Sequence, residues 1–433
     1  MAGGDTRALT FDVAGTHSIA DYRIDVQVLD HPNDPTSWIT IGTTLTASSS
    51  QTGQYAWKLL VSPGREAARR WPAGGVVRLR AVGASGELLS VMFHDSDEIA
   101  PVTNGLILVS PSPTPAESPV RARFLDRRSA VDAAETLEYY AAIDAPPTLA
   151  DFQARFPTTT ATTFYNAGDL GIGREMHCGA QAGGVVACYV SNYGTFGGDR
   201  HEALSAAVGR VGAFATVAMV YQPPASSPNS VRFMVYGANG ELVTQAQLDQ
   251  YGDNVSIPNN CLNCHGGARY DAAANAVIGA RFLPFDTTGF EFADVPGFRP
   301  ADQAANIRVL NDLVATTEPT PAIRELIDGF AATSAEKFVP AGWSGTVERE
   351  VYKQVVAVAC RSCHASLGGS FDFTSAAQFT NVRAAIADSL CGPSGNASAH
   401  DMPSAEIPLR RLWTTPARAY LIDYLDIKGA CEP

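Results

Sequence analysis

The pattern CxxCH occurs twice in this chain, at residues 261–265 (CLNCH) and at residues 360–364 (CRSCH). Two cysteines three positions apart can bond to the two vinyl carbons on one edge of a porphyrin, and the histidine that follows then lies under the iron as its proximal ligand. A chain that carries this pattern twice is expected to fold around two covalently bound c-type haems. The residues predicted to hold them are Cys261, Cys264 and His265 for the first haem and Cys360, Cys363 and His364 for the second.

A structural zinc site is the main alternative, because CxxC pairs also build zinc ribbons. Such a site takes four ligands from two CxxC pairs, and it gives no reason for a histidine at the same offset in both. The repeated histidine therefore favours haem, and the predicted cofactors are two haem c groups with their iron.

Composition limits the class of protein. The chain has 433 residues, enough for several domains at about 150 residues each, and its 45% hydrophobic and 17% charged residues are typical of a globular protein. No apolar run reaches the roughly 18 residues of a transmembrane helix. The formal net charge of −13 argues against nucleic-acid binding, which needs a basic surface, and favours a basic redox partner protein.

The N-terminus (MAGGDT) has neither the basic segment nor the apolar core of a secretory signal. Haem attachment of this type is typical of cytochromes matured outside the bacterial cytoplasm. We therefore expect the protein in the periplasm or at the cell surface, with its export signal missing from this form. In such an oxidising compartment the four remaining cysteines predict the disulfides Cys178–Cys188 and Cys391–Cys431, with four reduced buried thiols as the alternative.

The first 108 residues predict an immunoglobulin-like or fibronectin-like β-sandwich. Short runs of strand-forming residues alternate there with Gly, Pro, Asn and Asp, and the runs lie at 22–29, 38–44, 55–61, 76–82 and 87–93. Residues 109–120 follow with four prolines in the stretch SPSPTPAESP, which predicts an extended linker. This linker is the clearest domain boundary in the chain.

Residues 121–344 predict an α+β domain that carries the first haem. Helices are predicted at 129–142, 149–156 and 301–316, and strands at 185–191, 213–221 and 231–236. Glycines crowd the stretch around Cys178, and we interpret them as tight turns and close backbone approaches, because no strand–GxGxxG–helix pattern indicates a phosphate loop.

Residues 345–433 predict an all-α domain that carries the second haem. A helix at 347–359 leads into CRSCH, and further helices are predicted at 375–389 and at 416–426, with Pro416 in the first turn. In this order the segment resembles a class I cytochrome c domain, whose first and last helices cross near the haem edge.

The resemblance implies a sixth ligand for the second haem. Met402, followed by Pro403, resembles the distal methionine of class I cytochromes c, which often precedes a proline in a loop before the last helix. A thioether favours ferrous iron, so this ligation would raise the potential of the haem. His400 is the main competitor for the position, and a methionine that only packs in a core is the other alternative.

The distal ligand of the first haem is less constrained. The only methionine after residue 265 is Met402, so this ligand must come from upstream or be absent. His177 is the first choice and Met176 the second, in a Gly-rich turn that a Cys178–Cys188 disulfide would hold. The alternatives are an open iron, His201, and the two methionines in apolar runs, Met219 and Met234, which are better explained as core residues.

Two supporting groups are expected after the first motif. The carbonyl of Pro284 is a candidate to accept the second N–H of His265, since proximal histidines usually donate to a carbonyl or carboxylate. Arg281 is a candidate partner for a haem propionate, with a solvated surface arginine as the alternative.

The two motifs imply a c-type cytochrome that mediates one-electron transfer. The haem count also resembles that of dihaem cytochrome c peroxidases, which pair a high-potential His/Met haem with a catalytic haem. Their two haem domains are similar to each other, whereas here the motifs lie in dissimilar contexts. We therefore favour an electron carrier over a peroxidase-like enzyme with the first haem as its catalytic site and the second as its electron-transfer site.

Overall fold

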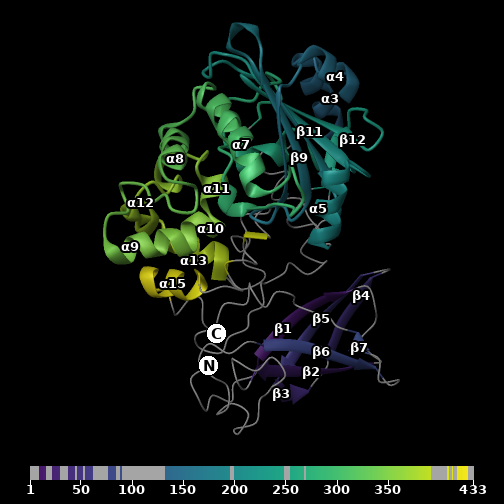
Figure 1. Cartoon of the computed structure of the whole chain (residues 1–433), viewed down its shortest axis with the longest axis vertical. Helices are drawn as coiled ribbons and strands as arrows, with labels where there is room; N and C mark the ends of the chain where they lie inside the picture. The colour runs from purple at the N-terminus through teal and green to yellow at the C-terminus, as the bar shows by residue number, and fades with distance from the viewer. Residues whose placement is uncertain are drawn as a thin grey trace. The chain divides into compact units, whose positions relative to one another are not determined.

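A computed structural model of the chain describes seven strands between residues 9 and 89, then residues 132–195, 199–247, 254–267, 270–391, 407–408, 412 and 417–427. The linker at 109–120, His400, Met402 and the side chains of the predicted Cys391–Cys431 pair lie outside the described residues. The chain divides into two compact units (Figure 1). The first comprises Met1–Thr114 and Leu409–Asp426, and the second comprises Pro115–Pro408 and Ile427–Pro433.

The first unit contains two antiparallel sheets, in strand orders β1-β5-β4 and β3-β2-β6-β7. Their strands are β1 (Leu9–Gly15), β2 (Tyr22–Leu29), β3 (Trp38–Thr43), β4 (Thr46–Gln51), β5 (Gln54–Val61), β6 (Val77–Gly83) and β7 (Leu88–Leu89). Strands therefore form where the alternating pattern predicts them, while a separate β-sandwich domain stays a prediction. Helix α15 (Ala417–Leu425) also belongs to this unit and lies where a last helix is predicted.

A six-stranded antiparallel sheet with helices forms the second unit, in the order β12-β11-β10-β9-β8-β15. The strands are β8 (Thr160–Asn166), β9 (Gly173–Ala180), β10 (Val186–Tyr193), β11 (Ala215–Tyr221), β12 (Val231–Gly237) and β15 (Phe290–Glu291). The three strands predicted in this region are confirmed as β10, β11 and β12. Strands β13 (Gln245–Gln247) and β14 (Asn254–Ser256) form a separate pair.

The Gly-rich stretch around Cys178 is a strand rather than the predicted turn. It forms β9, and the disulfide Cys178–Cys188 joins β9 to β10 between residues that face each other across the sheet. The glycines permit close approaches along this strand: a Cβ on Gly173 would lie 2.1 Å from the Ala203 carbonyl oxygen. The predicted disulfide is thus confirmed. The turn predicted at 171–178 is wrong because Gly173 makes room for helix α5 (Arg200–Gly209), whereas close approaches are confirmed at Gly173 and Gly179, and a tight turn at Gly183 and Gly184, whose φ values are +76° and +77°.

Helices surround the sheet. They are α3 (Ala133–Ala142), α4 (Leu149–Arg155), α5 (Arg200–Gly209), α6 (Asn259–His265), α7 (Pro300–Ala315) and α8 (Pro321–Ala332). Of these, α5 and α7 contact β8 and β9 directly. Asp132, Thr148, Asp199 and Thr320 cap the N-termini of α3, α4, α5 and α8 by accepting backbone N–H groups. The predicted helices at 129–142, 149–156 and 301–316 are confirmed as α3, α4 and α7.

The pleat of β9 gives its two sides different surroundings, because successive side chains point to opposite faces. Glu175 and His177 lie on the face that packs against α4 and α5, where Tyr189 stacks on His177 and contacts Phe152 of α4. Arg174 and Met176 lie on the other face, toward α6. This alternation decides which residues of β9 reach the first CxxCH motif.

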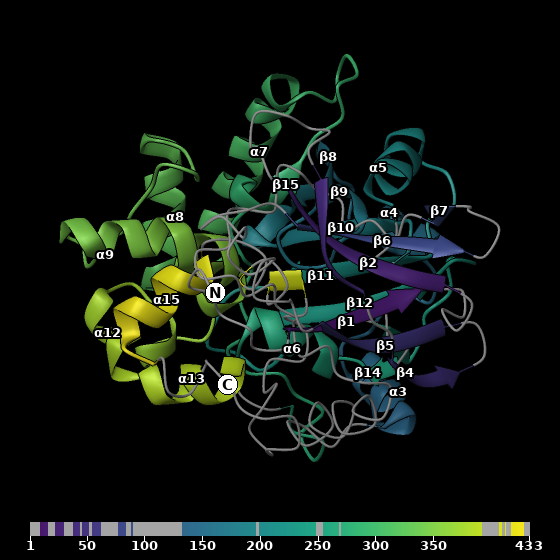
Figure 2. The same cartoon turned by 90° about the horizontal axis from the view of Figure 1, so that it is seen from below.

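A nearly continuous helix leads into the second motif, as predicted. It runs through α9 (Thr346–Val351), one π turn (η3, Tyr352–Val356) and α10 (Ala357–Ala359), and α11 (Arg361–His364) carries the motif. The predicted helix at 375–389 is two helices, α12 (Ala376–Asn381) and α13 (Arg383–Cys391). Figures 1 and 2 show α9, α12 and α13 grouped on the same side of the sheet as α8. Residues 345–408 thus share one compact unit with residues 115–344.

None of the helices in the described part of the chain combines the length and apolar character that a membrane span requires.

Candidate functional site

The two CxxCH motifs lie against each other, although they are 99 residues apart in the sequence. The Sγ atoms of Cys264 and Cys363 are 3.3 Å apart, and we call these two atoms the sulfur pair. Ser366 Oγ donates to the carbonyl oxygens of both cysteines, at 2.6 Å to Cys264 and 2.9 Å to Cys363. Gly266 has a φ of +65°, and a Cβ there would lie 2.4 Å from the Ser366 carbonyl oxygen. Glycine is therefore required where the motifs meet.

The four motif cysteines are free thiols that do not form a metal-binding group. Burial raises the pKa of Cys261 and the pKa of Cys360 to about 12, so both thiols are protonated at neutral pH. Within the described ranges no three His, Cys, Asp or Glu side chains are grouped closely enough to hold a metal ion. Zinc needs four ligands from one such group. The described residues therefore show no ligand group of the kind that the zinc alternative needs.

Both motif histidines are oriented by a backbone carbonyl group. The Nδ1 atom of His265 lies 2.8 Å from the Arg281 carbonyl oxygen, and that of His364 lies 2.8 Å from the Phe371 carbonyl oxygen. An Nδ1–H that donates to a carbonyl leaves Nε2 unprotonated, as ligation of a metal requires. The candidate acceptor for His265, the carbonyl of Pro284, is replaced by that of Arg281, three residues earlier.

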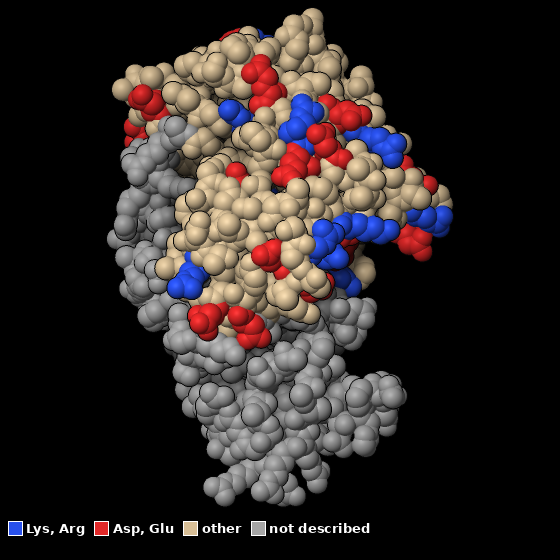
Figure 3. All heavy atoms as spheres, turned by 90° about the vertical axis from the view of Figure 1, so that its left-hand side faces the viewer, with Lys and Arg blue, Asp and Glu red and all other residues tan. Residues whose placement is uncertain are grey.

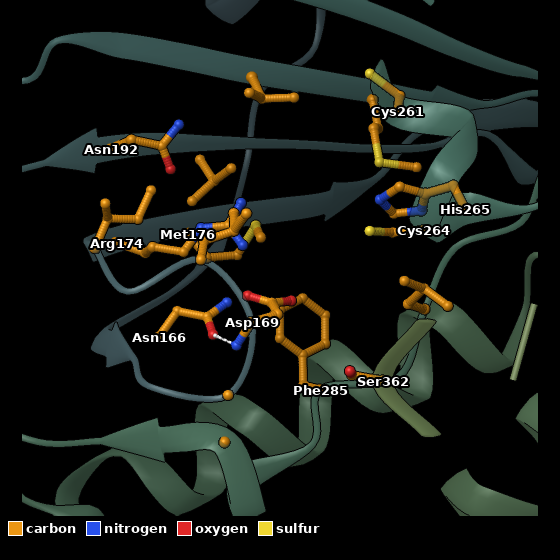
Figure 4. Close-up of a pocket in the computed structure, with 18 of the residues that line it drawn as sticks. Asn166, Asp169, Arg174, Met176, Asn192, Cys261, Cys264, His265, Phe285 and Ser362 are labelled. Carbon is orange, nitrogen blue, oxygen red and sulfur yellow. Dashed lines mark hydrogen bonds between the residues drawn. The ribbon is translucent and has the colours of Figure 1, made fainter. Parts of the chain in front are cut away.

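His265 is neutral at physiological pH. Burial lowers its pKa to about 4, opposed by the hydrogen bond to the Arg281 carbonyl and assisted by the positive charge of Arg174. In the part of the chain that the structure describes, its Nε2 atom has no hydrogen-bond partner, and the ring points into a cavity (Figure 4). The side chain therefore offers a neutral nitrogen to that cavity.

The cavity lies between α6 and the face of the sheet that carries Met176. Its empty space, counted together with the open mouth, is about 1650 Å³. Strands β9 to β12 supply one wall, and Cys261, Cys264 and His265 supply the opposite one. Aromatic side chains close the remaining sides: Phe164, Phe214, Phe233, Phe282, Phe285 and Phe290.

Of the two distal ligands considered for the first haem, the structure places one in the cavity. Met176 lines it and lies across from His265 (Figure 4). His177 does not line it, because its side chain leaves the opposite face of β9, stacks on Tyr189 and places Nε2 2.9 Å from Glu175 Oε1. The register of the sheet therefore places Met176, the second choice, in the cavity, and His177, the first choice, on the opposite face. Met219 also lines the cavity, whereas Met234 does not and is buried.

A polar wall of the cavity was not predicted. Arg174, Asn166 and Asn192 line it beside Met176 (Figure 4). In the described structure the buried Nε of Arg174 and Oδ1 of Asn192 have no hydrogen-bond partner. Burial lowers the pKa of Arg174, opposed by the charge of Asp169. The one available signal was an arginine two positions before the candidate ligand Met176.

Arg281 contributes its backbone rather than its side chain. Its carbonyl accepts from His265, its Nη1 donates to the Ala280 carbonyl at 3.0 Å, and it does not line the cavity. Arg174 lines the cavity and could therefore contact a carboxylate bound there, whereas Arg281 does not line it.

The second motif has a different environment. The ring of Phe373 stacks on His364 with the centroids 4.4 Å apart, and Trp343 donates its indole N–H to the Phe373 carbonyl at 2.9 Å. The predicted distal ligand, Met402, lies outside the described residues. The structure thus describes the surroundings of His364 at this site.

Arg361, between the two cysteines of the second motif, anchors that motif to the cavity wall. It is 2% exposed and donates to both carboxylate oxygens of Asp286, at 2.6 and 2.8 Å. Thr288 Oγ1 and the Ala335 carbonyl, each at 2.8 Å, accept further hydrogen bonds from it. Asp286 also lines the cavity, so one buried ion pair connects the two sites.

The face of the molecule shown in Figure 3 has acidic and basic side chains interspersed rather than separated by sign. This face therefore offers no single-sign patch for a charged partner, and the basic redox partner stays a prediction.

The comparisons leave the site to be interpreted from its own chemistry. No protein-family model, no curated protein and no solved structure matches this chain.

Proposed function

We propose that this protein is a dihaem c-type cytochrome that mediates one-electron transfer outside the cytoplasm. The observation that carries the proposal is the state of the two CxxCH histidines: each has its Nδ1 at 2.8 Å from a backbone carbonyl oxygen, and His265 faces a mainly apolar cavity. A histidine that binds a metal through one ring nitrogen usually donates a hydrogen bond from the other nitrogen to a carbonyl or carboxylate oxygen.

The cavity residues fit a haem attached to the first motif. Cys261 and Cys264 would form its thioether bonds, and His265 and Met176, on opposite walls, would hold its iron. Iron held between an imidazole and a thioether supplies reversible one-electron chemistry at a raised potential. A filled sixth position favours electron transfer, because a substrate could reach the metal only by displacing Met176.

Arg174 provides an independent test of fit. A buried polar atom without a hydrogen bond is costly, and in the described structure Arg174 Nε has no hydrogen-bond acceptor, although the charge of Asp169 acts on the guanidinium. A haem brings two carboxylates into the cavity, and these would complete the hydrogen bonding of Arg174 and Asn192.

For the second haem, Cys360 and Cys363 would form the thioether bonds and His364 would be the proximal ligand. We propose Met402 as its distal ligand on the resemblance to class I cytochromes c. The protein would then act in the periplasm or at the cell surface with a redox partner, and the Cys178–Cys188 disulfide is consistent with an oxidising compartment.

Arg174 also favours a second candidate, a peroxidase-like enzyme with the first haem as its catalytic site. A buried cation across from a proximal histidine can stabilise negative charge that develops on a bound substrate. The ferric optical spectrum with and without cyanide separates the two functions. Rapid cyanide binding and a high-spin signal would support the enzyme, and a low-spin spectrum that responds slowly would support the carrier.

The haem content tests the proposal directly. We expect the denatured chain, exported with its maturation machinery, to retain the mass of two haems after acid–acetone extraction, because thioether bonds resist it. Replacing Cys261 and Cys264 with serine should remove one haem mass, and the matched replacement of Cys178 and Cys188 should remove none. A chain that carries zinc, or no haem, would refute the proposed function.

Replacing Arg174 with glutamine should lower the potential of the first haem. Loss of a positive charge beside the haem carboxylates disfavours the ferrous state, and we expect a fall on the order of 60 mV, a tenfold change in a one-electron equilibrium. Arg174→Lys should recover much of this shift. Arg155→Gln, at a half-exposed residue paired with Asp144, should leave the potential unchanged, and redox titration of the three variants checks the assignment.

A further inference from the structure

We infer that the sulfur pair of Cys264 and Cys363 is the bridge that couples the two haems electronically. The inference rests on the proposed function, since both sulfurs must carry haem. It goes further by giving the second cysteine of each motif a role that the first cysteine does not have.

The contact is held from several sides. The two Sγ atoms are 3.3 Å apart, and Ser366 Oγ binds the carbonyl oxygens of both cysteines. Arg361 fixes the second motif through its ion pair with Asp286 in the wall of the first site. The contact is therefore a built feature of the site.

Haem attachment would make this sulfur contact part of a path between the two porphyrin rings. In a c-type haem each cysteine sulfur is bonded to a carbon that is itself bonded to the porphyrin ring. A contact between two such sulfurs joins the ring systems through two C–C bonds, two C–S bonds and one van der Waals step. The process it serves is a one-electron exchange: one iron is oxidised from ferrous to ferric while the other is reduced, and no bond or proton moves.

The first cysteines of the motifs lie in different surroundings. Cys261 Sγ is 3.1 Å from Asn260 Oδ1, and Cys360 Sγ is 3.9 Å from the Val355 carbonyl oxygen, so each contacts its own chain segment. Loss of Cys261 or Cys360 removes one thioether bond, as loss of Cys264 or Cys363 does, but leaves the sulfur pair intact. They are matched controls within the same motifs.

The test compares Cys264→Ala and Cys363→Ala with Cys261→Ala and Cys360→Ala in the full haem-loaded protein. Mass spectrometry first confirms two haems in each variant, and pulse radiolysis then measures how fast an injected electron equilibrates between them. We expect the two variants that lack the sulfur pair to equilibrate more slowly than Cys261→Ala and Cys360→Ala, each of which also loses one thioether bond but keeps the pair. Equal rates in all four variants would overturn the inference while leaving the dihaem function intact, whereas absence of haem from the wild type would refute the function itself.

A second pair of variants keeps all four cysteines. Gly266→Ala places a Cβ against the Ser366 carbonyl and should push the motifs apart, and it should slow equilibration with both haems retained. Gly297→Ala is the matched control, because Gly297 has a φ of +88° but no atom within 4 Å of the added Cβ. A wild-type rate in Gly266→Ala would contradict the inference even where a cysteine variant loses its haem.

Discussion

Replacing Met176 with alanine is expected to remove the sixth ligand of the first haem. Met176 lies across the cavity from His265, and its thioether is the ligand that would favour ferrous iron. We expect the potential of this haem to fall by a substantial part of the roughly 0.8 V range over which axial ligands tune haem. The weak near-infrared band of sulfur-ligated ferric haem should lose about half its intensity, since Met402 is the proposed ligand of the other haem.

Two further variants give this prediction its controls. His177→Ala removes the neighbouring side chain on the opposite face of β9 and should leave the near-infrared band and both potentials unchanged. Met219→Ala removes the other methionine of the cavity. Met219 pairs across the sheet with Phe233. The ring centroid of Phe233 lies 5.5 Å from that of His265, so this part of the sheet is close to the histidine. A band that disappears in Met219→Ala and persists in Met176→Ala would reassign the ligand.

Local patterns in the sequence predicted many elements of the fold but not the strand that carries the site. Apolar runs correctly indicated β10, β11 and β12, and helical periodicity indicated α3, α4 and α7. Strand β9 was missed because its glycines have the composition of a turn, whereas the structure uses them for close packing against Ala203. Tertiary packing overrode local propensity at this strand.

That one error carried over into the ligand assignment. In a turn, Met176 and His177 are equivalent candidates, but in a strand they point to opposite faces and only one can reach the cavity. Which one does so depends on the register between β9 and β10, in which Met176 faces Val190 and His177 faces Tyr189. Sequence spacing contains no information on which face the first haem motif will cover.

The contact between the two motifs was also beyond prediction from the sequence. Cys264 and Cys363 come together only because the sheet, α6 and α11 pack in one unit, and no local pattern links residues 99 positions apart. The role of Arg361 was hidden for the same reason, since an arginine between two haem-binding cysteines has no partner until Asp286 is placed beside it.

The largest expected loss of stability follows from that ion pair. Asp286→Ala would leave the guanidinium of Arg361, which is 2% exposed, without its carboxylate partner. Breaking a buried ion pair by removing one member costs about 3–5 kcal/mol, because the remaining charge stays desolvated. We expect the midpoint of urea unfolding, followed by tryptophan fluorescence, to fall accordingly.

The pair Asp294 and Arg299 supplies the control. Its N–O distance, 2.7 Å, is close to that of the buried pair, but Asp294 is 93% and Arg299 50% exposed, so Asp294→Ala should cost about 1 kcal/mol or less. The double variant Asp286→Ala with Arg361→Met should be more stable than Asp286→Ala alone, since it buries no unpaired charge. If Asp286→Ala unfolds at the wild-type midpoint, the hydrogen bonds of Arg361 to Thr288 and to the Ala335 carbonyl suffice to hold the second motif. The ion pair would then have no necessary part in keeping Cys363 against Cys264, and the coupling would depend on Ser366 and Gly266 alone.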